Sequence, residues 1–517
     1  KNIRCGNSLI SYDIFDQLTL FDDEEKERIN PFNWNSKSTG FGEIIEKGGF
    51  DVVIGNPPYI RIQVMKEWAP IEVEYYKKHY KTARQKNYDI YVVFVEKGLS
   101  LLNKNGLLSF ILPNKFMQQE YGENLRHSIA EGKTLEEILN FKDQQVFEKG
   151  TTYTCLFFLN KKGKNKGRYG EIKSLKGVHD VISLESNIAC WGKINNNNLN
   201  KKPWFFVCEH EKNLIEKLKI LPKIGDVVKS IFVGLQTSAD KVFILDKVKE
   251  TSSRKIVLQS KALSSNVIFE RDIVKPLISG IDVKNYIVPF KRQYVIFPYQ
   301  IENNKALLIP EKILKKQYPL TYQYLLKNKT TLENREKGKM KGGQWFGYIY
   351  RKNLAKQDQV KICVPRLVTR IHAIFDEKGE FYLDNVDVGG IILPSGDKSE
   401  YLFLLGLLNC KLLTYYLRKI STPFRGGFYS CNKQYLSRLP LHIINRNNPK
   451  EKTKYDRMVK LVDEMLELNK KKAALLPGSK RDKIEREIKI TDEKIDELVY
   501  ELYGITEEER KIIEKDS

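Results

Sequence analysis

The sequence predicts an α/β fold in its N-terminal part, followed by an α+β region and a C-terminal helical hairpin. Three observations predict this order. Short apolar, β-branched runs alternate with segments of helical spacing up to about residue 160. A stretch rich in Lys, Gly and Asn then covers 160–203. Heptad-like apolar spacing begins at Tyr455 and resumes after Pro477-Gly478. We therefore divide the chain into domains at 1–165, 220–445 and 446–517, with a connector at 166–219.

The first domain contains the clearest secondary-structure patterns. Apolar residues at helical spacing predict helices over 88–102 and 121–130. Because the strands of an open α/β sheet bind ligands at their carboxyl ends, polar residues that follow a strand are candidate site residues. Buried strands are predicted at 51–54 and 107–112, and further strands at 138–141 and 153–159.

Charge and composition limit the class of protein. The 517 residues carry a formal net charge of +23. Such a basic chain is typical of proteins that bind a polyanion, because neutralised phosphates release counterions. A Lys- and Asn-rich proteome is the alternative source of this charge, and the run 195–198 shows such a bias. No apolar run reaches the roughly 18 residues of a membrane span, so we expect no membrane contact.

The cysteine pattern predicts a reducing compartment. Seven cysteines are scattered singly along the chain, with no Cys-x-x-Cys pair. This spacing argues against both a zinc site and a disulfide framework, and the histidines form no metal-ligand pattern. We therefore predict a cytoplasmic protein without a metal site.

The candidate catalytic residues form one short turn. Asn56, Pro57, Pro58 and Tyr59 directly follow the predicted strand at 51–54. The two prolines stiffen the backbone, which aims the Asn56 side-chain oxygen and the Pro57 carbonyl as hydrogen-bond acceptors. Two such acceptors bind both N–H groups of a conjugated amine and free its lone pair for methylation. Tyr59 is placed to stack on a flat base.

This turn resembles motif IV of amino-group methyltransferases that use S-adenosylmethionine. The longer run Gly55-Asn-Pro-Pro-Tyr-Ile-Arg61 resembles the γ-class adenine-N6 DNA methyltransferases, and most of all those of type IIG restriction–modification enzymes. The resemblance implies the second half of a Rossmann-like methyltransferase sheet for residues 1–165. It also implies S-adenosylmethionine as the cofactor of the complete enzyme, and a bacterial or archaeal cytoplasm as its location.

Two further residues take expected roles from this resemblance. Gln145-Val-Phe147 with Thr151-Thr-Tyr153 resembles motif VIII, which implies that Phe147 stacks on the far face of the extruded adenine. The segment 3–9 resembles motif III, which implies that Asn7 contacts the cofactor, although the family usually has Asp there. The Gly-rich turn of the donor site is not found in the sequence, so we expect a fragment that is inactive by itself.

Residues 220–445 resemble the target-recognition domains of type IIG enzymes, which implies duplex DNA as the partner. Three stretches, at 341–351, 361–372 and 423–435, are rich in basic residues, and the first and third also contain aromatic and glycine residues. Such stretches are typical of DNA contacts. Arg366, Arg370 and Arg425 are the candidate DNA-binding residues.

Three interpretations stay open at this stage. Residues 62–86 are polar, basic and aromatic, which fits either a solvated helix or a loop that closes over the target base. The C-terminal hairpin fits a structural brace or a dimerising coiled coil, and we expect a monomer that is completed by its own N-terminal region. The predicted function is site-specific adenine-N6 methylation of DNA. The alternatives are methylation of RNA or of protein glutamine, and a non-catalytic DNA-specificity module.

Overall fold

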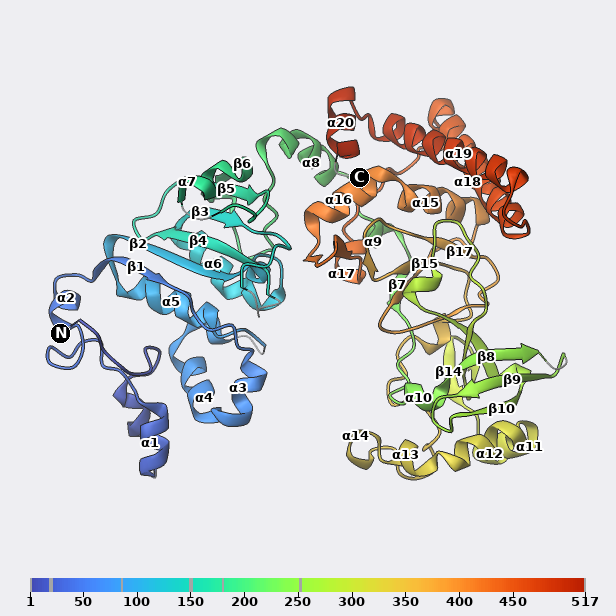
Figure 1. The fold of residues 1–517 in the computed structure, drawn as a ribbon, viewed down its shortest axis with the longest axis horizontal. Coiled ribbons are helices and arrows are strands. Elements are labelled where there is room, and N and C mark those ends of the chain that lie inside the picture. The colour runs from blue at the N-terminus through green and yellow to red at the C-terminus, as the bar shows by residue number, and fades with distance from the viewer. Residues whose placement is uncertain are drawn as a thin grey trace. The chain divides into compact units, whose positions relative to one another are not determined.

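The computed structural model describes residues 2–17, 22–84, 87–147, 152–178, 181–250 and 253–515. The chain forms two compact units, Lys1–Asn213 and Leu214–Ser517. Blue to green colours mark the first unit in Figure 1, and green to red colours mark the second. None of the helices in the described ranges combines the length and the apolar character that a membrane crossing requires.

A six-stranded sheet forms the centre of the first unit (Figure 1), with the order β1-β2-β4-β3-β5-β6. β1 is parallel to β2 and β3 is parallel to β5, whereas the other neighbours are antiparallel. The carboxyl ends of β1, β2 and β3 therefore lie at one edge of the sheet. The strands are β1 (Phe50–Gly55), β2 (Leu102–Pro113), β3 (Leu135–Asn140), β4 (Thr154–Asn160), β5 (Lys166–Ile172) and β6 (Ile188–Asn195).

The helices of the first unit complete its core. α5 packs closely against β2 at Gly98, which has no side chain. A Cβ at this position would lie only 2.6 Å from Leu108 Cδ1, so a larger residue would not fit there. Leu125 and Ile129 of α6 join the same core. The helices are α1 (Asp23–Ile29), α2 (Gly42–Glu46), α3 (Ile62–Trp68), α4 (Pro70–His79), α5 (Tyr91–Leu101), α6 (Glu123–Gly132) and α7 (Val181–Ser186).

The four strands predicted in the first domain are present, but β1 is not buried as predicted. Val52 is 56% exposed and Ile54 is 80% exposed. β1 is an edge strand of the sheet, and Val53 is the one residue of its apolar run that packs against the core. The apolar run thus identified a strand correctly, whereas its burial depends on neighbours that the run itself cannot specify.

Residues 166–219 are more than the connector that we predicted. They contain β5, β6 and α7, and two of these elements extend the central sheet. The sequence conceals β5, because Lys166, Gly167 and Arg168 weaken its apolar pattern. Pairing with β3 on one side and β6 on the other holds this strand in place. The roles that we assigned to the four segments of the chain remain predictions.

Residues 62–84 form helices, which supports the first of the two interpretations of this stretch. Tyr75, Tyr76 and Tyr80 are buried, and they pack in the core of the first unit. The Tyr75 hydroxyl accepts a hydrogen bond from the Ser11 backbone, and the Tyr80 hydroxyl donates one to the Leu9 carbonyl. These tyrosines therefore anchor the N-terminal segment to the helices of the first unit.

The prediction of unpaired cysteines is wrong for two of them. Cys190 of β6 and Cys208 form a disulfide, with their Cα atoms 5.8 Å apart. They are 18 residues apart in the sequence, so no short motif predicts the pair. The segment that carries Cys208 runs back alongside β6, and this places the two sulfurs next to each other.

The second unit contains four sheets (Figure 1), listed by strand order as β10-β9-β8-β12-β11-β18, β13-β14, β17-β15-β19-β7 and β16-β21-β20. The strands are β7 (Ser230–Val233), β8 (Ile244–Glu250), β9 (Lys255–Ser260), β10 (Ser265–Glu270), β11 (Val274–Ile278), β12 (Gln293–Ile296), β13 (Tyr299–Glu302), β14 (Lys305–Leu308), β15 (Lys361–Pro365), β16 (Leu367–Val368), β17 (Ile374–Asp376), β18 (Tyr382–Leu383), β19 (Val388–Ile392), β20 (Pro423–Phe424) and β21 (Phe428–Ser430).

The helices of the second unit lie before, between and after these strands. They are α8 (Lys212–Lys219, which crosses the boundary of the units), α9 (Ile224–Val227), α10 (Asp240–Phe243), α11 (Glu311–Gln317), α12 (Pro319–Lys327), α13 (Lys329–Glu333), α14 (Arg335–Gly338), α15 (Lys398–Asn409), α16 (Lys411–Ile420), α17 (Lys433–Leu436), α18 (Pro449–Ala473), α19 (Ser479–Tyr503) and α20 (Glu507–Lys515).

The helical hairpin is confirmed, because α18 and α19 pack against each other and turn at Pro477-Gly478. Met458 and Val462 are fully buried, and both reach Gly406 of α15. The apolar side of α18 is therefore covered within this unit, which favours the brace over a dimerising coiled coil. A capping box begins α20, since Thr506 and Glu509 exchange hydrogen bonds.

Candidate functional site

The turn Asn56 to Tyr59 lies at the carboxyl end of β1, where the parallel strands of the first unit end. Asn56 and Pro58 are exposed, whereas Pro57 is buried. The Pro57 carbonyl takes no hydrogen bond from another residue in the described ranges. An exposed amide and an open carbonyl are thus available to a ligand at this edge of the sheet.

The Tyr59 hydroxyl ties this turn to the sheet. It lies 2.8 Å from Asn56 Oδ1 and 3.0 Å from the Ile111 carbonyl of β2, and it can donate to either acceptor. Burial, with a smaller contribution from Cys155, raises the pKa of Tyr59 to about 12. The hydroxyl therefore keeps its proton at any physiological pH and orients the Asn56 side chain as a donor.

Two aromatic rings from distant parts of the chain meet beside Asn56. The centroids of the Tyr59 and Phe147 rings are 6.4 Å apart, with an interplanar angle of 58°. A flat base held between two rings needs parallel rings about 7 Å apart, twice the stacking rise of about 3.4 Å in DNA, so the tilted Phe147 ring has to turn before a base can enter. Phe147 lies in the segment between β3 and β4, at the same edge of the sheet. Thr151 of the same motif lies outside the described residues.

Several residues that hold Tyr59 in place were not predicted as part of the site. Tyr91, at the start of α5, meets the Tyr59 ring edge-on with centroids 6.4 Å apart. The segment that follows the turn is held by two backbone hydrogen bonds. Ile62 N–H donates to the Tyr88 carbonyl, and Ile90 N–H donates to the Ile60 carbonyl. In the sequence, Tyr91 stood out only as part of the helical spacing over 88–102, which predicts packing of that helix and no contact with Tyr59.

Asp89 is an acidic group close to this framework. Burial raises its pKa, and the nearby Arg61 and Lys115 oppose that shift. The Tyr121 hydroxyl, which is bonded to that of Tyr91, lies 3.5 Å from Asp89 Oδ2. This short polar chain supports the segments on both sides of Tyr59.

Asn7 lies in a separate part of the first unit. Its Oδ1 accepts the backbone N–H of Leu9 at 3.2 Å, and its side chain also bonds to Tyr76. In the part of the chain that the structure describes, no contact joins Asn7 to Asn56 or Tyr59. An amide oxygen can accept two hydrogen bonds, so one lone pair of Asn7 remains for a ligand.

One group of potential metal ligands occurs among the described residues, namely Glu171, Cys190 and Cys208. The two sulfurs are joined to each other as a disulfide. The carboxylate is already bonded to the amine of Lys142 and the hydroxyl of Tyr169. These partners occupy the atoms that a metal ion would need.

Comparison with known protein families agrees with the two-part organisation of the chain. Residues 1–147 match the Eco57I restriction-modification methylase family, and residues 275–441 match the TaqI-like C-terminal specificity domain. The chain thus contains one region that is similar to a methylase family and a second that is similar to a specificity domain. The predicted resemblance to restriction–modification enzymes is thereby confirmed.

Two curated proteins are similar to this chain over most of its length. The type II restriction enzyme and methyltransferase RM.Eco57I of Escherichia coli is 27% identical over 98% of this chain and 50% of its own length. The type II methyltransferase M.PaeR7I of Pseudomonas aeruginosa is 25% identical over 76% of this chain and 64% of its own length. The chain thus spans about half to two thirds of the length of these relatives.

A solved structure supports the fold. The type IIL restriction–modification enzyme MmeI, determined in complex with DNA, aligns with a TM-score of 0.56 and 14% identity. The alignment covers 95% of this chain and 62% of that chain. At this identity the likeness describes the fold alone.

The three predicted arginines of the specificity region have different surroundings. Arg370 forms an ion pair with Asp492 of α19 at 3.1 Å and donates to the Asn409 carbonyl. Arg366 donates to the Asn385 carbonyl at 2.7 Å. Arg425 is exposed in the turn between β20 and β21. Arg370 and Arg366 thus have contacts within the protein, whereas the side chain of Arg425 is open to a ligand.

The three basic stretches also differ in how far their side chains are buried. Trp345, Phe346 and Tyr348 are buried core residues, so they cannot stack on a nucleic acid as we expected. β15, in the second stretch, is buried along its whole length. Phe424 and Phe428, by contrast, are paired partners across the β20–β21 turn and are about 40% exposed. The first stretch exposes one aromatic residue, Tyr350, whereas the third exposes two beside the exposed Arg425.

Proposed function

We propose that this chain forms the base-holding part of an S-adenosylmethionine-dependent adenine-N6 DNA methyltransferase, joined to its DNA-recognition domain. The approach of Tyr59 and Phe147 next to Asn56 is the observation that carries this proposal. Two aromatic rings beside a hydrogen-bond acceptor suit a flat, extruded base, which enters once the tilted Phe147 ring has turned parallel to Tyr59. The match of residues 1–147 to a methylase family supports the same chemistry.

The proposed reaction uses orientation and charge. The target adenine leaves the DNA stack and enters between Tyr59 and Phe147, where ring contacts offset the lost base stacking. Asn56 Oδ1 and the Pro57 carbonyl accept the two N–H groups of the exocyclic amine. These bonds draw the nitrogen toward tetrahedral geometry and localise its lone pair for in-line attack.

S-adenosylmethionine is the proposed donor and supplies an electrophilic methyl group when it is bound. Asn7 is the residue that we assign to it, because one lone pair of its Oδ1 is open to the amino group of a ligand. The exposed edge of β1 and the exposed Asn56 leave the amine-binding side of the site open.

Duplex DNA is the proposed partner of the second unit. Arg425, Phe424 and Phe428 are the residues that we assign to this contact, because all three are exposed on one short hairpin. Arg366 stays a candidate, because its side chain is partly exposed and its one side-chain contact in the described residues is with the Asn385 carbonyl. Arg370 is assigned to the ion pair with Asp492.

A methylation assay tests this function. The intact natural polypeptide that contains residues 1–517 is incubated with labelled S-adenosylmethionine and, separately, with duplex DNA, structured RNA and unfolded protein. The expected product is N6-methyladenine in the duplex DNA, and sequencing of the modified bases identifies the site. A label on RNA or on protein glutamine would favour the corresponding alternative, and no label on any substrate would favour a DNA-specificity module.

Substitutions of the two rings separate stacking from hydrogen bonding. Phe147→Ala is expected to lower kcat/KM by about 5- to 150-fold, because stacking contributes about 1–3 kcal/mol per base. Tyr59→Phe keeps its ring and loses the bond to Asn56 Oδ1, so a smaller loss of roughly 10-fold is expected. With the pKa of Tyr59 near 12, the wild-type rate should show no fall from Tyr59 ionisation between about pH 7 and 9.5.

The readout for these two variants is 2-aminopurine fluorescence at the mapped adenine, combined with the methylation rate. Phe147→Ala should reduce the fluorescence gain that reports extrusion, whereas Tyr59→Phe should preserve it. Full activity and full fluorescence gain in Phe147→Ala would contradict the proposed base sandwich.

A further inference from the structure

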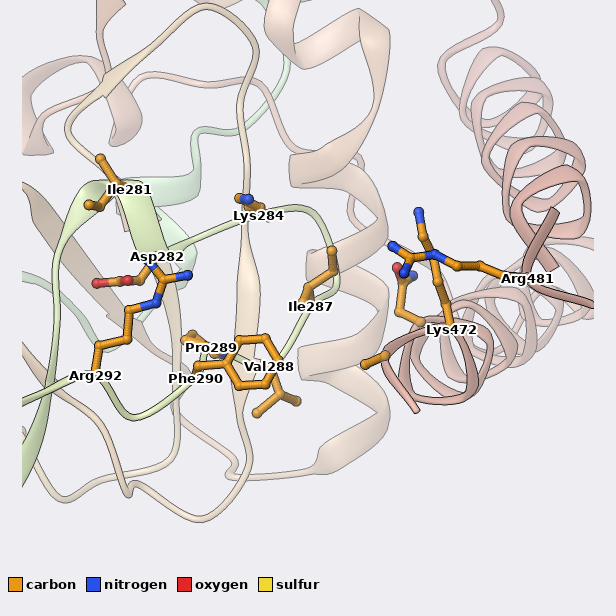
Figure 2. Close-up of a pocket in the computed structure, with 12 residues that line it drawn as sticks. Ile281, Asp282, Lys284, Ile287, Val288, Pro289, Phe290, Arg292, Lys472 and Arg481 are labelled. Carbon is orange, nitrogen blue, oxygen red and sulfur yellow. The ribbon is translucent and has the colours of Figure 1, made fainter. Parts of the chain in front are cut away.

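A cavity of about 720 Å³ lies in the second unit between the β11–β12 connection and the α18–α19 hairpin. Figure 2 shows the segment 281–292 on one side and the side chains of Lys472 and Arg481 on the other. None of the residues that line this cavity belongs to the turn Asn56 to Tyr59 or to the three basic stretches.

Four cationic side chains line the cavity, and two of them have no ion pair among the described residues. Lys284 and Arg292 are exposed, and no described acidic group contacts either of them. Lys472 and Arg481 share one acidic partner, because Glu485 lies 2.9 Å from the former and 3.4 Å from the latter. The carboxylate of Asp282 in the lining is bonded to the backbone and hydroxyl of Ser279.

The tip of the hairpin adds further positive charge. Residues 470–483 contain six Lys and Arg side chains and a single acidic residue, Asp482. In α18 and α19 these residues flank the turn at Pro477-Gly478. A basic edge of this kind therefore continues from the cavity along the end of the hairpin.

The rim of the cavity exposes large apolar side chains. Ile281, Val288 and Phe290 are 77%, 66% and 70% exposed. The segment that carries them is nevertheless fixed, because Val283 and Tyr286 are buried and Tyr286 donates its backbone N–H to the Ala373 carbonyl. Asn285 is also bonded to the imidazole of His372. These three apolar side chains are therefore exposed to solvent, although the backbone of their segment is fixed by buried residues and hydrogen bonds.

We propose that this cavity and the basic tip of the hairpin bind the sugar–phosphate backbone of duplex DNA, outside the base-holding site. Lys284, Arg292, Lys472 and Arg481 contact phosphates, and Phe290 packs against the adjoining sugars. The hairpin is then a DNA-binding clamp as well as a brace. The proposal rests on the DNA partner of the proposed function and adds a sequence-independent contact to it.

Charge complementarity favours DNA over a second copy of this chain. A copy would bring its own cationic edge against these four cations, at a repulsive cost in a partly desolvated cavity. A phosphate backbone supplies regularly spaced anions, and each contact releases counterions. The exposed apolar rim fits the carbon face of deoxyribose without any need for a base-specific contact.

The salt dependence of DNA binding tests this clamp. The intact protein is titrated with a mixed-sequence DNA duplex at several salt concentrations. The variant carries Lys284→Gln, Arg292→Gln, Lys472→Gln and Arg481→Gln. Because each phosphate contact contributes about 0.9 to the slope of log K against log salt, the slope should fall by roughly 2 to 4.

A matched variant removes the same charge away from the cavity, with Lys452, Lys460, Lys489 and Lys494 changed to Gln. All four are exposed on α18 or α19. Lys460 lies about 18 Å along the helix from Lys472, and Lys494 lies about 20 Å from Arg481. The slope of this variant is expected to stay within about 1 of the wild type. Thermal unfolding of both variants checks that they are folded.

The outcomes separate the two proposals. If the wild type does not bind duplex DNA, the proposed function and the clamp both fail. If the wild type binds and the cavity variant keeps its slope, or the matched variant loses as much, the clamp alone is overturned. Sedimentation of the wild type supplies a second measurement: self-association that Phe290→Asp abolishes, with unchanged DNA binding, would assign the surface to a second copy.

Discussion

Asn56→Ala is expected to leave duplex DNA binding within a few-fold of wild type while it lowers the methylation rate by about 10²- to 10³-fold. This is the usual loss when one preorganised group that stabilises developing charge is removed. Asn56 Oδ1 is exposed at the end of β1 and is oriented by the Tyr59 hydroxyl. Alanine removes the acceptor and leaves the Tyr59–Phe147 slot in place, so the effect should appear in kcat.

The measurement is single-turnover methylation of the mapped duplex by the intact protein. Asn105→Ala is a matched control, because Asn105 is an exposed asparagine of β2 far along the strand from its carboxyl end. The control should keep the wild-type rate. Equal rates for Asn56→Ala and wild type would exclude Asn56 from the chemistry and would remove the basis of the proposed mechanism.

Lys361→Met is expected to destabilise the second unit by about 3–5 kcal/mol, the usual cost of leaving one member of a buried ion pair without its partner. Lys361 is fully buried, and its amine donates to Asp376 Oδ2 at 2.7 Å and to the carbonyls of Gln357 and Gln359. Asp376 also accepts two backbone N–H groups. The substitution therefore leaves a buried carboxylate with only part of its partners.

Hydrogen exchange of the amides in β15 measures this effect in the intact protein, because exchange reports the opening free energy of that strand. Lys398→Met is the control, since Lys398 and Glu377 form an exposed ion pair 3.1 Å long. Exposed pairs contribute about 0–1 kcal/mol, so the control should exchange almost like wild type. Equal exchange in both variants would show that the buried pair adds no net stability.

Local patterns predicted much of the fold in the first unit. The apolar, β-branched runs at 51–54 and 107–112 correspond to β1 and β2, because a strand of this kind follows from adjacent residues. The heptad spacing likewise predicted α18 and α19. β5 was missed, since its Lys, Arg and Gly residues form a strand only through the pairing with β3 and β6.

For the candidate site, the short turn Asn56 to Tyr59 was evident from the sequence alone, because its prolines and its place after a strand are local features. Only the tertiary structure shows that Phe147 lies beside Tyr59. It also shows that Arg370 forms an ion pair with Asp492 and that Trp345 is buried. The sequence by itself thus determined β1 and β2, the helical hairpin and the position of the turn after β1. The tertiary structure decided which side chains are exposed and which meet, because burial and long-range contacts depend on packing between segments that no local pattern records.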